Sequence, residues 1–216
     1  MTAKDSAGSG PQPNVARPEI RARDADSAGS IHEVEASSRI ALVTGAGSGI
    51  GRELALALAR RGFVMWVCGR RPEPLAQLAR ECRGIRPFAA DVTRAADREA
   101  LVAALGAAHA KLDLLVNNAG IQRPVDFAAG IDARAIEEEI AINLTAPILL
   151  TGLLLGQLRR SPRARAVTAS SGLALAPKAS APVYCATKAG LSNFSLALGF
   201  QLEPLGIRVV DVITPL

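Results

Sequence analysis

The 216-residue sequence is poor in the side chains that many catalytic sites use. It has two histidines and three cysteines, and aromatic residues make up only 3% of the chain. The cysteines, at positions 68, 82 and 185, are an odd number and lack the spacing of a zinc site. They indicate a reducing compartment, so we expect a cytoplasmic protein. A histidine-dependent triad and a metal site are therefore unsupported.

Long apolar runs are also missing. No apolar stretch reaches the roughly 18 residues that a membrane-spanning helix needs. The longest, 146–155, is interrupted by Pro147, Thr151 and Gly152. The hydrophobic fraction is nevertheless 49%, so Ala, Leu, Val and Ile can build a sizeable core. We therefore expect one domain, with no transmembrane helix and no membrane partner.

Large apolar residues are nearly absent from 1–38, which is rich in Ser, Ala, Gly and Pro. Such a segment cannot bury enough surface to offset the entropy of ordering, so we expect a disordered N-terminal tail. It lacks the apolar stretch of a secretory signal, and its six acidic residues argue against a transit peptide. A mis-assigned start codon is the alternative explanation.

Charge is unevenly divided between this tail and the rest of the chain. Six acidic and four basic residues give the tail a charge of −2, which leaves +7 for the remaining residues out of +5 overall. A basic core suits an anionic ligand, and a phosphorylated cofactor is sufficient to account for it. Nucleic acid is the less favoured alternative, because the arginines are scattered through predicted helices rather than clustered.

Short apolar, β-branched runs alternate with helical patterns from residue 39 onward. The expected strands cover 39–43, 63–68, 85–90, 112–116, 165–168 and 208–213. The first expected helix ends near Arg61, and the others cover about 73–82, 93–109, 132–140, 143–159 and 183–202. Apolar strands separated by helices are typical of a parallel sheet covered on both faces. The pattern therefore predicts an α/β fold with a doubly wound, Rossmann-type sheet over 39–216.

A glycine-rich turn, 44–51, lies between the first expected strand and helix, where a dinucleotide fingerprint is found. Gly45 is expected to permit the tight turn, and Gly49 and Gly51 to let the backbone approach a pyrophosphate at the helix N terminus. Ser48 and Ile50 are the other predicted cofactor contacts in this turn. The alternative is a tight turn that binds no ligand.

Two arginines, Arg70 and Arg71, follow the second expected strand. An acidic residue at this place would bind the ribose hydroxyls of NAD, whereas an arginine can form paired hydrogen bonds with a 2′-phosphate. The pair therefore favours NADP over NAD. A solvated arginine pair at a helix start is the alternative interpretation.

Tyr184 and Lys188 are four residues apart in an expected helix and so share one helix face. A phenol beside an ammonium is a ready proton donor for a carbonyl oxygen, because the positive charge favours the phenolate left behind. Ser171 ends a strand thirteen residues before the tyrosine, and its hydroxyl could bond a substrate oxygen. Ser170 is the alternative candidate. Cys185 is expected to pack rather than react, because it faces away from the tyrosine.

Together these motifs resemble the classical short-chain dehydrogenase/reductase family, from about Arg39 to the last residue. The resemblance implies that Asp91 and Val92 lie by the adenine of the cofactor. It also implies that an Asn-Asn-Ala-Gly turn lines the cofactor cleft, with contacts from Asn118, Ala119 and Gly120. Read alone, these would be an ordinary helix cap and an ordinary turn. The segments 170–175 and 183–188 further resemble the branch related to the oxidoreductase DltE.

The same resemblance implies an NADP-dependent oxidoreductase that acts on a small carbonyl or alcohol. Tyr184 would exchange a proton with the substrate oxygen, which Ser171 would hold. Lys188 would bond the ribose and lower the pKa of the tyrosine, and Asn143 would hold a water in the proton relay. The helices near 143–159 and 183–202 would pair two copies of the chain into a homodimer.

The family pattern continues past Leu216, where this sequence stops. By resemblance, a loop that touches the nicotinamide, a segment that covers the substrate and a seventh strand would follow the sixth. We therefore expect a chain that is incomplete at its C terminus. The competing hypothesis is a truncated, catalytically inert remnant that still binds NADP.

Overall fold

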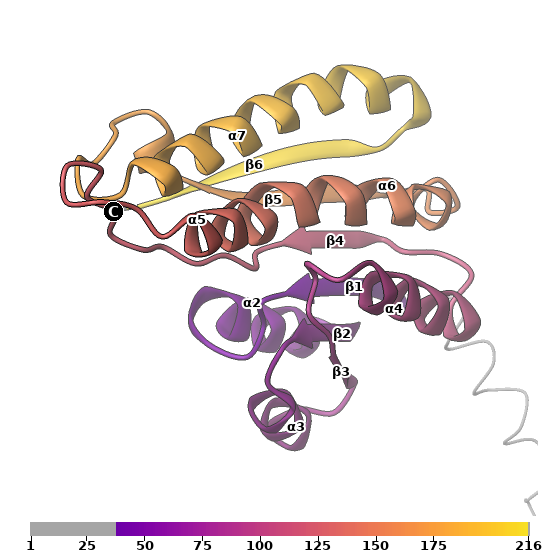
Figure 1. The fold of residues 1–216 in the computed structure, drawn as a ribbon. Coiled ribbons are helices and arrows are strands. Elements are labelled where there is room, and N and C mark those ends of the chain that lie inside the picture. The colour runs from indigo at the N-terminus through magenta and orange to yellow at the C-terminus, as the bar shows by residue number, and fades with distance from the viewer. Residues whose placement is uncertain (1–37, 216) are drawn as a thin grey trace, which may run out of the picture. The chain divides into compact units, whose positions relative to one another are not determined.

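The computed structural model describes residues 38–215, so the predicted disordered tail lies outside the described residues except for Ser38. Within this range six strands form one parallel sheet in the order β3-β2-β1-β4-β5-β6 (Figure 1). The strands are β1 (Arg39–Thr44), β2 (Phe63–Gly69), β3 (Ile85–Ala89), β4 (Leu114–Asn117), β5 (Arg165–Ser171) and β6 (Arg208–Thr214). This order is that of a doubly wound Rossmann-type sheet, which confirms the predicted fold class.

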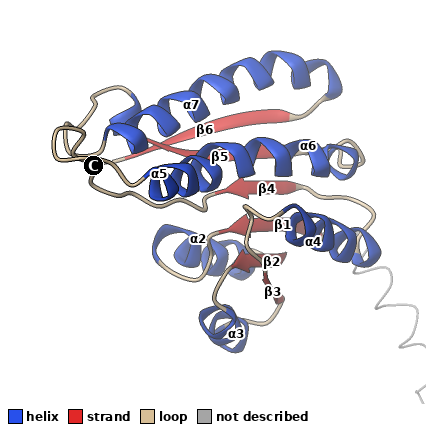
Figure 2. Ribbon diagram, in the orientation of Figure 1, coloured by secondary structure: helices blue, strands red, loops and turns tan. Residues whose placement is uncertain are grey.

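Helices alternate with the strands along the chain (Figure 2). They are α2 (Gly49–Arg60), α3 (Pro72–Glu81), α4 (Ala95–Ala108), α5 (Ala133–Ile140), α6 (Ala146–Leu158) and α7 (Pro182–Leu202). A proline lies in the first turn of α3 and of α7, where its missing N–H has no helical partner to lose. Pro147, near the start of α6, follows directly on a π-helical turn. The Asp132 side chain caps α5 by accepting a hydrogen bond from the Ala135 N–H.

The core has two layers because side chains alternate between the faces of each strand. Ile40 and Leu42 of β1 face α4 and α6, whereas Ala41 and Val43 face α2 and α3. All four side chains are buried. α7 packs over β5 and β6 and contributes Leu202 to the first layer. Helices therefore lie on both faces of the sheet, as its continuous apolar strands predict, but α2 and α3 pack mainly on β1, β2 and β3, and Val212 of β6 stays exposed.

α5, a π-helical turn (Ala141–Thr145) and α6 form one continuous run, Ala133–Leu158. In the described part of the chain it is the one helix long and apolar enough, by length and composition, to cross a membrane. The sequence predicts no transmembrane helix. Leu150, Leu154 and Leu158 on the inner face of this run are fully buried in the core. Packing on the sheet therefore accounts for the apolar character of that face.

Two predicted boundaries were wrong near the site. β5 extends to Ser171 rather than Thr168, because its last three residues pair with 212–214 of β6. The helices expected at 132–140 and 143–159 are joined, because the π-helical turn bridges them. Both differences depend on tertiary contacts that no local pattern reveals.

Candidate active site

The glycine turn is held tightly against the end of β4. A β-carbon at Gly45 would lie 2.7 Å from the Ala119 Cα, and one at Gly51 would lie 2.6 Å from the Gly45 carbonyl oxygen and clash with the Asn118 amide. Gly49 has a φ of +56° and no described atom near its notional β-carbon. Gly51 therefore permits close packing within the turn, and Gly49 supplies a left-handed backbone. Their approach to a pyrophosphate stays a prediction.

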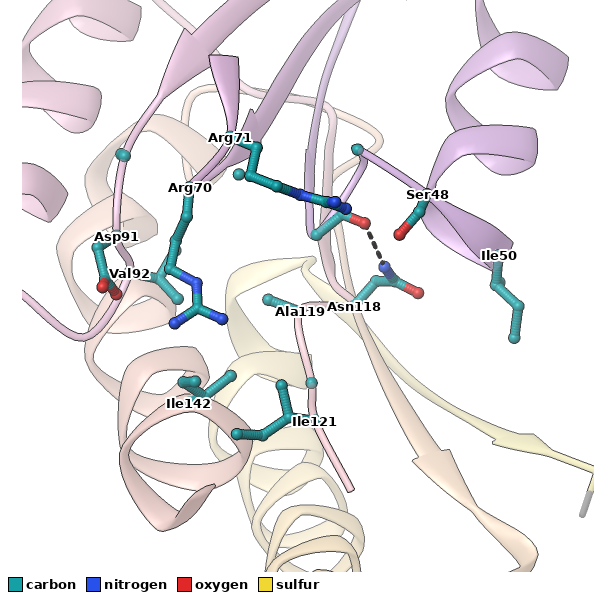
Figure 3. Close-up of a pocket in the computed structure, with 15 residues that line it drawn as sticks. Ser48, Ile50, Arg70, Arg71, Asp91, Val92, Asn118, Ala119, Ile121 and Ile142 are labelled. Carbon is teal, nitrogen blue, oxygen red and sulfur yellow. Dashed lines mark hydrogen bonds between the residues drawn. The ribbon is translucent and has the colours of Figure 1, made fainter. Parts of the chain in front are cut away.

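Asn118 and Thr44 tie the ends of β4 and β1 together. The Asn118 Nδ2 donates to the Thr44 carbonyl oxygen at 3.0 Å and, more weakly, to that of Gly45 at 3.4 Å. The backbone N–H groups of Asn118 and Ala119 both donate to the Thr44 hydroxyl at 3.1 Å. One of the side-chain bonds is visible in Figure 3. The Asn-Asn-Ala-Gly turn therefore fixes the geometry of the crevice floor.

The N terminus of α2 is open to an anion. Ser48 is its N-cap residue, yet its side chain makes no capping hydrogen bond. The first turn of α2 contains no acidic residue. Unpaired backbone N–H groups and the helix dipole therefore favour a negative group at this point.

A cavity of about 530 Å³ lies over these elements at the carboxyl ends of the strands. It opens where the strand order reverses between β1 and β4, the usual ligand site of such sheets. Most of the predicted cofactor-binding residues line it: Gly45, Ser48, Ile50, Arg70, Arg71, Asp91, Val92, Asn118, Ala119 and Gly120. Gly49, Gly51, Tyr184 and Lys188, which were also predicted to bind the cofactor, do not line it. Five further lining residues were not predicted, namely Gly47, Gly69, Ala90, Ile121 and Ile142.

Arg70 and Arg71 point to different parts of the cavity (Figure 3). Arg71 extends toward Ser48, and Arg70 extends toward Ile142. The Arg70 Nη1 donates to Glu138 Oε1 at 2.9 Å. Arg71 has no ion pair within residues 38–215. No local pattern indicates the contact between Arg70 and Glu138, since the two residues are 68 positions apart.

Asp91 closes a local turn and also lines the cavity. One of its carboxylate oxygens accepts hydrogen bonds from the Thr93 N–H at 3.0 Å and the Thr93 hydroxyl at 2.7 Å. Asp91 was considered as an ordinary helix cap, but the N-cap residue of α4 is Arg94, and Asp91 instead closes a turn with Thr93. Asp91 and Val92 both line the cavity, as an adenine contact requires.

Asn143 is fully buried in the π-helical turn. Its amide exchanges two hydrogen bonds with the backbone of Ile121, both at 2.8 Å, and donates to the Thr187 hydroxyl at 3.2 Å. π-Helical turns are rare and are frequently found at functional sites. Asn143 therefore links the loop after β4 to α7.

Lys188 is the buried cation of the site, with 4% of its surface exposed. Its ammonium donates to the Ala169 carbonyl oxygen at 2.6 Å and lies 5.6 Å from the centroid of the Tyr184 ring. Burial lowers the pKa of Lys188 to about 8, and the charge of Asp211 partly opposes this shift. Two of its three donors remain for other acceptors.

Gly120 separates Lys188 from Asn143. A β-carbon at Gly120 would lie 3.3 Å from the Asn143 Oδ1 and 3.5 Å from the Lys188 Nζ. Gly120 also lines the large cavity, whereas Lys188 and Asn143 lie behind it and are not among the lining residues. A side chain at this position would crowd both groups.

Ser171 lies at the end of β5, and its hydroxyl accepts a hydrogen bond from the Leu173 N–H at 3.2 Å. Ser170 points to the other face of the strand. Its hydroxyl is buried without a hydrogen-bond partner in the described residues. Tyr184 is half-buried in the first turn of α7, one helical turn before Lys188. Cys185 is buried, with its thiol against the backbone of Lys178, so it packs as predicted.

Comparison with known proteins agrees with this architecture. A model of the short chain dehydrogenase family matches residues 39–216. The oxidoreductase DltE of Bacillus subtilis is 39% identical over 176 residues, which cover 81% of this chain and 70% of DltE. Other relatives are named D-erythrulose reductase and L-xylulose reductase. Some matches are longer proteins, of which this chain spans as little as 52% or 65%.

Two similar crystal structures contain nicotinamide cofactors. A metagenomic short-chain oxidoreductase in complex with NADP has a TM-score of 0.76 and 28% identity, and the match covers 81% of each chain. A 3-ketoacyl-(acyl-carrier-protein) reductase from Brucella melitensis complexed with NADH has a TM-score of 0.78 and 29% identity, over 82% of this chain and 75% of that one. Because the family model spans nearly all of the folded sequence and DltE shares 39% of its aligned residues, this chain belongs to the short-chain dehydrogenase family of oxidoreductases.

Proposed function

We propose that this chain is an NADP-dependent oxidoreductase that moves a hydride between the nicotinamide and a small carbonyl or alcohol, with Tyr184 as the acid–base. The observation that carries the proposal is the junction at Gly120. There a cavity of nucleotide size reaches Gly120, whose notional β-carbon would lie 3.3 Å from the Asn143 Oδ1 and 3.5 Å from the buried Lys188 Nζ. A nucleotide in the cavity would therefore reach the Lys188–Tyr184 pair.

The residues present fit such a cofactor. The uncapped N terminus of α2, with the Ser48 hydroxyl, suits the pyrophosphate. Lys188 has donors free for a ribose. At the end of β2, Arg70 and Arg71 replace the acidic residue that would bind the ribose hydroxyls of NAD, which favours a 2′-phosphate. When bound, the cofactor supplies the hydride.

The protein's own part in the reaction is to hold the substrate oxygen and to move a proton. In reduction, the Tyr184 hydroxyl donates its proton to the carbonyl oxygen as the carbon accepts the hydride. The Lys188 charge stabilises the phenolate that remains. The Ser171 hydroxyl, already oriented by the Leu173 N–H, bonds the same oxygen. Asn143 orders a water that returns a proton through Lys188.

Purified protein with NADPH or NADH and a panel of small aldehydes and ketones tests this proposal. We expect oxidation of NADPH with at least one carbonyl, and tighter binding of NADPH than of NADH. NADPH binding without turnover across the panel would instead indicate a nucleotide-binding protein without reductase activity, and tighter NADH binding would contradict the cofactor choice.

We also propose a homodimer and a cytoplasmic location. The outer faces of α6 and α7 expose apolar side chains, which include Leu149, Leu153, Leu196 and Phe200. Such faces are candidates for pairing with a second copy. The three cysteines are free thiols, in keeping with a reducing compartment.

A further inference from the structure

Three side chains form a linked pair of salt bridges beside the cofactor cavity. Glu138 of α5 accepts from the Arg70 Nη1 at 2.9 Å with one oxygen and from the Arg123 Nη2 at 2.5 Å with the other. Arg70 lies just after β2, so its pair with Glu138 spans from the end of β2 to α5. The Arg70 side chain itself lines the cavity.

A second arginine, Arg123, also holds the Glu138 carboxylate. The Arg123 Nη2 donates to Glu138, and its Nη1 donates to the Ala135 carbonyl oxygen at 3.0 Å. Its hydrogen bond, followed by that of Arg70, lowers the pKa of Glu138, so the group is a carboxylate at neutral pH. Arg123 does not line the cavity, so Glu138 keeps its ion pair with Arg123 if Arg70 moves.

The two arginines of the cavity are therefore unequal. Arg71 has no ion pair within residues 38–215 and points toward the N terminus of α2 (Figure 3). Arg70 already forms an ion pair with Glu138 of the same chain. A phosphate can use Arg71 directly, but it must compete with Glu138 for Arg70.

We propose that Glu138 is an internal competitor for the 2′-phosphate of the cofactor and thereby a determinant of the NADP-over-NAD preference. This inference rests on the proposed function. If Arg70 leaves Glu138 for the phosphate, its ion pair with that residue is lost. If Arg70 bridges the two, the carboxylate stays close to the phosphate and repels it. Both arrangements weaken the binding of a 2′-phosphate, so the sign of the effect is fixed.

The pair is suited to exchange rather than to holding the fold together. The Arg70 and Glu138 side chains are both substantially exposed, and exposed ion pairs contribute little to stability. A Glu138→Gln variant should therefore fold normally. Glu137→Gln is a matched control. It removes the same charge from the preceding residue of α5, whose side chain is exposed and has no ion pair in the described chain.

Calorimetric titration of the whole chain with 2′,5′-ADP and with 5′-AMP isolates the contribution of the 2′-phosphate to binding, because the two ligands differ only in that group. For Glu138→Gln we expect 2′,5′-ADP to bind roughly two- to fivefold more tightly, the gain that an exposed ion pair can represent. The affinity for 5′-AMP should be unchanged, and Glu137→Gln should match the wild type for both ligands. Unchanged or weaker 2′,5′-ADP binding by Glu138→Gln would overturn the inference.

A second pair of variants tests whether Glu138 acts through Arg70. In an Arg70→Gln background, Glu138→Gln should no longer improve 2′,5′-ADP binding, and an undiminished gain would refute competition for Arg70. The affinities of the wild-type chain for 2′,5′-ADP and 5′-AMP show whether this inference or the NADP proposal has failed. If it binds 2′,5′-ADP no better than 5′-AMP, the NADP proposal fails and this inference with it. If it prefers 2′,5′-ADP but Glu138→Gln has no effect, only this inference fails.

Discussion

At the scale of single residues, Lys188 is the charge around which the proposed chemistry is arranged. It is buried, bonded to the Ala169 carbonyl oxygen and placed behind the Tyr184 ring. Burial disfavours the ammonium and lowers the pKa of Lys188 to about 8, well below that of an exposed lysine. At neutral pH it is still mostly charged and can stabilise a phenolate.

This pKa predicts how reduction depends on pH. As the pH rises through about 8, Lys188 loses its charge and the phenolate loses its stabilising neighbour. We therefore expect kcat/KM for carbonyl reduction to fall above about pH 8, since this ratio reports the groups of the free enzyme. The measurement is a profile of kcat/KM from about pH 6 to about pH 10. A flat profile across pH 8 would contradict the role assigned to the Lys188 charge.

Glu139 is a second buried charge, and it predicts a pH-dependent stability. It is fully buried in α5, and neither carboxylate oxygen has a hydrogen-bond partner in the described residues. Burial raises the pKa of Glu139, and the nearby Arg123 opposes this only in part. The folded chain therefore holds this proton more tightly than the unfolded chain. Its contribution is fully present below the unfolded pKa of 4.5 and is lost as the pH rises through the folded value.

The substitution Glu139→Gln should remove this loss of stability with rising pH. We expect the free energy of unfolding, from urea titrations at about pH 5 and about pH 8, to change less between the two conditions in the variant than in the wild type. Glu137→Gln, at an exposed position of the same helix, should keep the wild-type difference. An identical pH dependence in Glu139→Gln and wild type would exclude Glu139 as the cause.

Much of the site at residue scale follows from local sequence. Gly45, Arg71, Asn118 and Gly120 all line the cavity, because each lies within a few residues of the end of a strand that is recognisable from its apolar run. What the sequence does not reveal is which side chains meet across the sheet. The Arg70–Glu138 pair is such a contact, and the packing role of Gly51 against Asn118 is another.

At the scale of elements, the π-helical turn between α5 and α6 positions Asn143. The sequence predicts two separate helices here, because a π-helical turn has no local sequence signature. The turn occurs where Asn143 forms hydrogen bonds with Ile121 of the loop after β4 and with Thr187 of α7. Both partners are distant in sequence, so this element could be found only from the fold.

Asn143→Ala tests the importance of these bonds. The substitution would leave the Ile121 N–H and carbonyl without their partner in a buried place, which costs about 1–3 kcal/mol per group. We expect a loss of stability of about 2 kcal/mol or more in urea unfolding, together with a loss of carbonyl reduction. Asn193→Ala, at an exposed position of α7, is the control and should be near neutral. Wild-type stability in Asn143→Ala would show that the turn does not depend on this side chain.

At the scale of the whole molecule, the exposed apolar faces of α6 and α7 predict self-association. Leu196 and Phe200 of α7 are 63% and 70% exposed. We expect light scattering to give the mass of a dimer and Phe200→Glu to shift it toward the monomer, because a buried unpaired charge disfavours an interface. Phe127→Glu, at a similarly exposed loop position outside α6 and α7, should remain dimeric. A monomeric wild type would contradict the pairing.

The central claim concerns the whole arrangement of cavity, lysine and phenol, and Tyr184→Phe tests it most directly. The variant keeps the ring and loses only the hydroxyl that donates the proton. With NADPH and a carbonyl that the wild type reduces, we expect kcat to fall about 100-fold or more while the dissociation constant of NADPH stays within about twofold. Full turnover in the Phe variant would contradict the acid–base role of Tyr184.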